Sequence, residues 1–117
     1  EQIIINLLRN AVDAIKGLRD PAIEITVSAG SHAFLSVRDN GPGVSDLENL
    51  FEPFFTTKKP GEGTGLGLAI SSGIAADFGG RLTAHNASDE GGRGAVFELE
   101  LPLHDPGHKA GTRLAAE

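Results

Sequence analysis

Four short segments of this chain alternate between apolar and polar residues, which is the pattern of strands that bury one face of a sheet. Their apolar positions are Ile23, Ile25 and Val27; Ala33, Leu35 and Val37; Leu82 and Ala84; and Ala95, Phe97, Leu99 and Leu101. The segments 2–18 and 68–78 instead have helical periodicity. Because each strand buries only one face, the helices must cover that face. The sequence therefore predicts an α+β fold, a two-layer α/β sandwich.

Periodicity also predicts which residues the helices bury. The expected inward residues are Ile4, Leu7, Leu8, Ala11, Ile15 and Leu18 in the first helix, and Leu66, Ile70, Ile74 and Phe78 in the second. The pair Gly79-Gly80 is expected to end the second helix. The segment ASDEGGRG, between the last two strands, is predicted to be a polar and flexible loop.

Length and charge limit the classes of protein to consider. With 117 residues, the chain is long enough for one domain with a core and too short for two. Its formal net charge of −6 argues against nonspecific binding to nucleic acid or anionic lipid. The absence of cysteine excludes disulfides and thiol catalysis. We expect one domain over residues 1–103, a disordered tail or linker over residues 104–117, and a chain cut from a longer protein, since it does not begin with Met.

A polar stripe runs along one flank of the first predicted helix. It consists of Gln2, Asn6, Asn10 and Asp13. Such a stripe is usually a solvated face. Asn and Asp are poor helix formers, however, so two asparagines favour ligand binding over solvation.

A carboxylate ends the second predicted strand. Asp39 has the same parity as Leu35 and Val37, so its side chain is expected to face the core. A buried carboxylate needs hydrogen-bond donors. Either the backbone amides of the following turn, DNGPG, or an N–H group of a ligand would supply them.

A glycine-rich turn opens the second helix, where converging amides suit phosphate. Its glycines are Gly61, Gly63, Gly65 and Gly67. The spacing fits neither a Walker-type P-loop nor a dinucleotide-binding motif. The segment FEPFF lies before this turn and is either a satellite core or a movable lid. The pair Lys58 and Lys59 follows FEPFF, and these lysines are either solvated charges or contacts to phosphate.

Four segments carry a family resemblance. NLLRNAVDA, DNGPGV, FEPFFTTK and GEGTGLGLAI resemble, in order, the N, G1, F and G2 boxes of the catalytic ATP-binding domain of sensor histidine kinases. The resemblance covers residues 1 to 102 and implies the Bergerat ATP-binding fold of gyrase and heat-shock chaperones, with a mixed, mostly antiparallel sheet. Its details are most similar to the nitrogen-regulation, oxygen-sensing and C4-dicarboxylate sensor kinases.

The resemblance implies roles for particular residues. Asn10 would hold Mg²⁺ through its amide oxygen, and Asn6 would orient the water of the metal or the phosphates. Asp39 would accept a hydrogen bond from the exocyclic amine of adenine, which would favour ATP over GTP. Further contacts to the nucleotide are implied for Gly41, Gly43, Lys58, Gly63, Thr64, Gly65, Leu66 and Gly67. The residues implied in catalysis are Asn6, Asn10 and Lys58.

The activity that the resemblance implies is that of a protein histidine kinase. The γ-phosphoryl group of ATP would pass to a histidine on a separate dimerisation helix, and then to an aspartate of a response regulator. The histidines of this chain are His32, His85, His104 and His108, and none is followed by the acidic residue and proline of a phosphoacceptor helix. Expected partners are therefore the phosphoacceptor domain of a dimeric parent kinase and a receiver domain, without nucleic acid or direct membrane contact. The expected location is the cytoplasm.

Two alternatives stay open from the sequence. A degenerate docking module would keep the fold without kinase activity, although intact Asn10 and Asp39 argue against it. A Bergerat-fold ATP hydrolase carries a glutamate base where this chain has Asn6, so intrinsic hydrolysis is expected to be slow. The chain also departs from its relatives: Asp13 stands where many carry a basic residue, and the strand that usually precedes the first box is absent.

Overall fold

The structure, a computed structural model, describes residues 2–53, 55, 66–90 and 92–103. The elements in chain order are α1 (Gln2–Ala14), β1 (Ile23–Ala29), β2 (His32–Asp39), α2 (Gly67–Asp77), β3 (Arg81–Asn86), the 3₁₀ helix η1 (Ala87–Glu90) and β4 (Ala95–Pro102). The predicted tail, residues 104–117, lies outside the described residues. Neither α1 nor α2 combines the length and the apolar character that crossing a bilayer requires.

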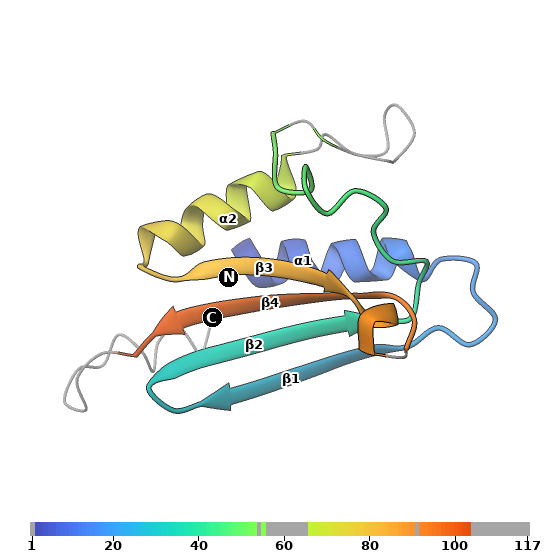
Figure 1. Cartoon of the computed structure of the whole chain (residues 1–117), viewed down its shortest axis with the longest axis horizontal. Coiled ribbons are helices and arrows are strands. Elements are labelled where there is room, and N and C mark those ends of the chain that lie inside the picture. The colour runs from blue at the N-terminus through green and yellow to red at the C-terminus, as the bar shows by residue number, and fades with distance from the viewer. Residues whose placement is uncertain (1, 54, 56–65, 91, 104–117) are drawn as a thin grey trace.

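The sheet has four strands in the order β1-β2-β4-β3 (Figure 1). The β1–β2 hairpin places Ile25 opposite Val37, and β4 inserts between β2 and β3, so that Val37 lies opposite Phe97. All pairings among the described strands are antiparallel. The hairpin predicted from the sequence is confirmed, whereas a parallel pairing, expected for a mixed sheet, is absent from the described strands.

Both helices pack on the same face of the sheet and close one core (Figure 1). The core joins residues of α1, α2 and three strands: Ile3, Leu7, Ala11, Val37, Ala75, Leu82, Ala95, Phe97 and Leu99, together with Leu50 from the β2–α2 connection. Phe51 and Phe55 pack against it. The Phe51 and Phe97 rings meet edge-on, with 6.5 Å between the ring centroids. The two-layer α/β sandwich is thus confirmed, and these two phenylalanines extend its core.

The helices bury different residues from those predicted by periodicity. α2 buries Ser71 and Ala75. Of the predicted inward stripe, Ile74 packs against the core, whereas Ile70 and Phe78 are 48% and 54% exposed, so the prediction is wrong for these two residues. Residues four apart drift by about 40° around a helix, so a stripe of every fourth residue winds off the contact face. Of the two buried residues, Ser71 accepts a hydrogen bond from Asn6 of α1 at 2.9 Å, so this face of α2 lies against α1.

The first helix is shorter than predicted. α1 ends at Ala14, and Gly17 adopts a φ of 82° in the turn that follows, a conformation that carries the chain away from a helix. In α1, Ile3 is buried, whereas Ile4, which was predicted to face the core, is only half-buried. α2 ends as predicted, since the Gly80 N–H donates back to the Ala75 carbonyl and Gly79 has a φ of 80°.

The edge strand β1 lies beyond the cover of the helices. Ile25 and Val27 have the parity of the inner face but are 52% and 71% exposed, in contrast to the burial expected for them. α1 packs over β2, and α2 packs over β3 and β4. The sequence pattern identified the correct face of β1 but could not show where the helix layer stops.

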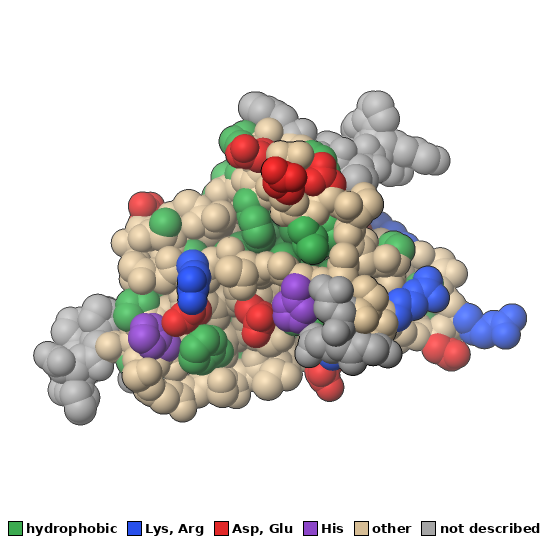
Figure 2. All heavy atoms as spheres, viewed as in Figure 1, with side chains coloured by type: hydrophobic (Ala, Val, Ile, Leu, Met, Phe, Trp, Pro, Cys, Tyr) green, Lys and Arg blue, Asp and Glu red, His purple; other side chains and the backbone are tan. Residues whose placement is uncertain are grey.

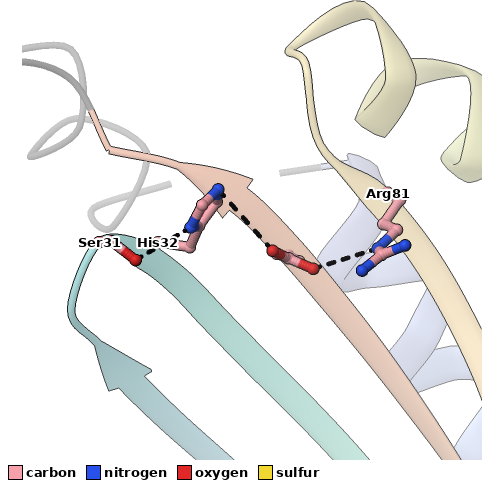
Figure 3. Close-up of polar contacts among 4 residues, drawn as sticks. Ser31, His32 and Arg81 are labelled. Carbon is pink, nitrogen blue, oxygen red and sulfur yellow. Dashed lines mark hydrogen bonds and ion pairs between the residues drawn. The ribbon is translucent and has the colours of Figure 1, made fainter.

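The opposite face of the sheet carries polar and charged side chains, several of which are visible in Figure 2. Glu100 on β4 lies 3.1 Å from Arg81 Nε on β3 and 3.8 Å from His32 Nε2 on β2 (Figure 3). Such partly exposed pairs contribute about 1 kcal/mol at most. The described residues therefore form two layers, with this face of the sheet toward solvent.

Candidate functional site

Asp39, the last residue of β2, holds a buried carboxylate that is 2% exposed. Its Oδ1 accepts hydrogen bonds from the backbone N–H groups of Gly41, at 2.9 Å, and Ala95, at 3.3 Å. Oδ2 receives no hydrogen bond from the described residues. Every fully buried side-chain oxygen or nitrogen among these residues has a partner, so Oδ2 is not fully buried. Oδ2 is therefore accessible to a donor from outside the protein. The two readings of Asp39 are compatible, since one oxygen holds the turn and the other is free for a ligand.

The turn after Asp39 is packed between two other parts of the chain. Asn40 Oδ1 accepts from the Ala22 N–H at 2.9 Å, and its Nδ2 donates to the Asp20 carbonyl at 2.7 Å. On the other side, a Cβ at Gly41 would lie 2.6 Å from the Ala14 carbonyl oxygen. Only glycine at position 41 lets the turn pass this close to the C-terminal end of α1.

The two asparagines in the polar stripe of α1 differ in their contacts. Asn6 Nδ2 donates to the Gly67 carbonyl at 3.1 Å and to Ser71 Oγ at 2.9 Å, which joins α1 to the first turn of α2. Its Oδ1 faces Gln2 Nε2 at 3.4 Å. The Asn10 side chain, one turn later, forms no hydrogen bond with a described residue and is half-buried. Asn10 is thus the amide of this stripe that is free to bind a ligand.

α1 spaces the predicted site residues along one helix. Asn6 lies beside Gly67 at the start of α2, and Ala14 lies beside Gly41 in the turn after β2. Asn10 lies midway between these two contacts, which are separated by eight residues, or about 12 Å of helix axis. The structure therefore brings the carboxylate turn, the asparagine stripe and the start of α2 together around α1.

Several predicted contacts belong to the segment between Phe55 and Leu66. Lys58, Gly63, Thr64 and Gly65 lie outside the described residues, as do Lys59 and Gly61. Among the described members of this segment, Leu66 directly precedes α2 and makes no side-chain cap to it. Asp13 pairs with Lys16 at 3.1 Å.

Two residues from the β3–β4 region were missed by the sequence reasoning. Asn86 pairs with the backbone of Val44 through both amide atoms, and Arg93 Nε donates to the Gly41 carbonyl at 3.2 Å. Asn86 continues the inward parity of Leu82 and Ala84, which is the signal that identified Asp39. That signal could have found Asn86, whereas nothing in the pattern around Arg93 points to its contact.

Comparisons with known proteins match most of this chain. Residues 1–105 match the model of a family described as histidine kinase-, DNA gyrase B- and HSP90-like ATPases. The two-component sensor PprA of Pseudomonas aeruginosa is 43% identical in an alignment of length 121, and the alignment covers 95% of this chain and 12% of PprA. The C4-dicarboxylate transport sensor protein DctB of Rhizobium meliloti is 45% identical over 105 residues, which cover 86% of this chain and 16% of DctB. The chain thus spans less than a fifth of either relative.

Solved structures show the same fold. The catalytic domain of histidine kinase ThkA matches with a TM-score of 0.72 and 37% identity, covering 86% of this chain and 64% of that domain. ThkA in complex with the response regulator protein TrrA matches with a TM-score of 0.69 and 33% identity, covering 88% of this chain and 28% of ThkA. These matches confirm the α/β fold and the resemblance to sensor histidine kinases that the four sequence boxes indicated.

Proposed function

Since this chain belongs to the family of histidine kinase-, DNA gyrase B- and HSP90-like ATPases, we propose that it is the catalytic ATP-binding domain of a sensor histidine kinase. ATP would lie along α1, from the turn after Asp39 to the start of α2. The observation that carries this proposal is the Asp39 carboxylate, in which two backbone amides fix Oδ1 and leave Oδ2 as an open acceptor.

Base recognition follows from the chemistry of that acceptor. Oδ2 of Asp39 would accept a hydrogen bond from the exocyclic amine of adenine. Guanine has a carbonyl at the corresponding position, so two acceptors would face each other, with a desolvation cost and no compensating bond. The amides of Gly41 and Ala95 hold the carboxylate in place, and the site would therefore select ATP over GTP.

The metal and the phosphates would lie beside Asn10 and the start of α2. The described residues include no cluster of three or more His, Asp or Glu side chains that could bind a metal alone. A single amide oxygen from Asn10 fits Mg²⁺, which keeps several waters and takes its other ligands from phosphate oxygens. Bound Mg²⁺ supplies positive charge against the triphosphate. The N–H groups at the start of α2 suit phosphate, and we propose Lys58, Gly63, Thr64 and Gly65 as further contacts.

In the proposed reaction, an imidazole nitrogen of a histidine on a separate dimerisation helix attacks the γ-phosphorus of ATP. The new P–N bond replaces the bond to the β-phosphate oxygen, and ADP leaves. This domain contributes positioning and charge neutralisation, the main requirements of phosphoryl transfer. The complex of ThkA with TrrA supports a response-regulator receiver domain as the next partner, and the similarity to sensor proteins supports the assignment. We place the domain in the cytoplasm, where ATP is available.

Binding of Mg-ATP is expected to stabilise the folded chain. At a free concentration of 100 times the dissociation constant, a ligand that binds only the native state adds about 2.7 kcal/mol to the free energy of unfolding. Urea unfolding with and without Mg-ATP measures this change, with Mg-GTP at the same concentration as the comparison. A free energy of unfolding that stays the same with Mg-ATP would favour the docking-module alternative.

Asn10→Ala is expected to weaken binding of Mg-ATP by about tenfold and to affect metal-free ATP much less, because the lost amide oxygen serves the metal. Alanine is the better helix former, so α1 should not lose stability. Calorimetric titrations with ATP in Mg²⁺ and in chelator measure both affinities. Gln2→Ala, two turns earlier on the same stripe and exposed, serves as the control. Equal losses for both forms of ATP would argue against a metal ligand at Asn10.

A further inference from the structure

The segment that follows the Asp39 turn is held by one side chain from β3. Asn86 Oδ1 accepts from the Val44 N–H at 2.7 Å, and Asn86 Nδ2 donates to the Val44 carbonyl at 2.8 Å. These are the only hydrogen bonds that the backbone of Val44 makes with described residues. Asn86 thus pairs with Val44 as an adjacent strand would.

Asn86 also lies against the turn itself. A Cβ at Gly43 would lie 2.9 Å from Asn86 Oδ1, and Gly43 has a φ of 85°, so the turn passes directly over the amide. Glycine is required at this position for both reasons. Loss of the Asn86 side chain would therefore free the backbone of Val44, the residue that directly follows Gly43.

The same residue is linked to the carboxylate through the sheet. Asn86 lies opposite Ala95 in the β3–β4 ladder, and the Ala95 N–H donates to Asp39 Oδ1 at 3.3 Å. The end of the β3–β4 ladder thus supports both sides of the turn, through the Asn86 side chain on Val44 and through the Ala95 amide on Asp39.

From these contacts we propose that Asn86 is a positioning residue for nucleotide recognition. It holds Val44, and through it the neighbouring Gly43, so that the turn keeps its place beside Asp39, without itself touching the base. The inference rests on the proposed binding of ATP at this turn. Because the effect concerns the geometry around the base, loss of Asn86 should reduce discrimination between adenine and guanine and not only overall stability.

The test compares Asn86→Ala and Asn86→Asp with the unchanged protein in calorimetric titrations with Mg-ATP and Mg-GTP. Asn86→Ala should weaken ATP binding by about tenfold, since two hydrogen bonds that order the turn are lost. It should also narrow the ratio of ATP to GTP affinity. Asn86→Asp preserves side-chain size and the acceptor for the Val44 N–H, but it places an acceptor against the Val44 carbonyl. The loss of ATP affinity in Asn86→Asp should be at least as large as in Asn86→Ala. If the alanine variant does not fold, the titrations of Asn86→Asp still test the role of Asn86.

Thr83→Ala, on the same strand but exposed, is the matched control and should bind like the unchanged protein. Faster amide exchange at Val44 in Asn86→Ala would show directly that the hydrogen bond from the Val44 N–H is lost. If the Asn86 variants keep the affinity for ATP, or lose ATP and GTP binding in equal proportion, the proposed role of Asn86 is overturned and the proposed function is not affected. Absence of ATP binding by the unchanged protein would overturn the proposed function, and this inference with it.

Discussion

Asp39→Asn should lower the affinity for ATP by at least about 100-fold, because the change removes a charged acceptor and turns it into a donor facing the adenine amine. The fold should survive. The remaining carbonyl oxygen of the asparagine can still accept from the Gly41 and Ala95 N–H groups, so the expected loss in the free energy of unfolding is about 1 kcal/mol.

Calorimetric titration with Mg-ATP and Mg-GTP measures this effect, and urea unfolding measures the cost to the fold. The amide that replaces Oδ2 can donate to the carbonyl of guanine, so the preference for ATP over GTP should shrink or reverse. Asp20→Asn removes the same charge from an exposed loop position and is the control. An Asp39→Asn variant with undiminished ATP affinity would remove the central assignment of the site.

Gly94→Ala should have the largest effect on stability, a loss of about 3 kcal/mol or more in the free energy of unfolding. Gly94 is buried with a φ of 101°, a conformation that alanine rarely adopts. An added Cβ would overlap the carbonyl oxygen of Asp39 and approach the Asn40 Cα to 2.9 Å. The variant should also bind ATP poorly, because relief of this overlap moves the backbone that carries the carboxylate.

Gly30→Ala is the matched control for this change. Gly30 lies in the β1–β2 turn, its φ is outside the left-handed range, and a Cβ there would meet nothing within 4 Å. Urea unfolding of both variants measures the difference. Similar stabilities for the two variants would mean that β4 can move away from the turn at little cost, and that the turn is held less rigidly than its contacts indicate.

The fold could be predicted from the sequence wherever the position of a residue in its own strand decides whether its side chain is buried. Alternation along β4 identified Phe97 and Leu99 as buried, because successive side chains of a strand point to opposite faces. The same parity placed Asp39 in the core. It could not predict the exposure of Val27, because burial of an edge strand depends on where the helix layer ends.

The candidate site could be predicted only in part, for a related reason. The residues proposed to carry its chemistry, Asn10 and Asp39, were identified from residue type, pattern and the family resemblance. The contacts that hold them were not, because Gly94 against Asp39 and Asn86 against Val44 join segments more than 40 residues apart in the chain. Sequence periodicity describes one element at a time and contains no information about such pairs.

By itself, the sequence determined the two-layer architecture, the inward carboxylate at the end of β2 and the family to which the chain is similar. Only the tertiary structure decided how the described residues divide these polar groups. Asp39 binds them through one oxygen and leaves the other open, Asn6 joins two helices while Asn10 has no hydrogen-bond partner among them, and Asn86 supports the turn. The physical reason is that local pattern sets which face a side chain occupies, whereas its hydrogen-bond partners are set by segments that only folding brings together.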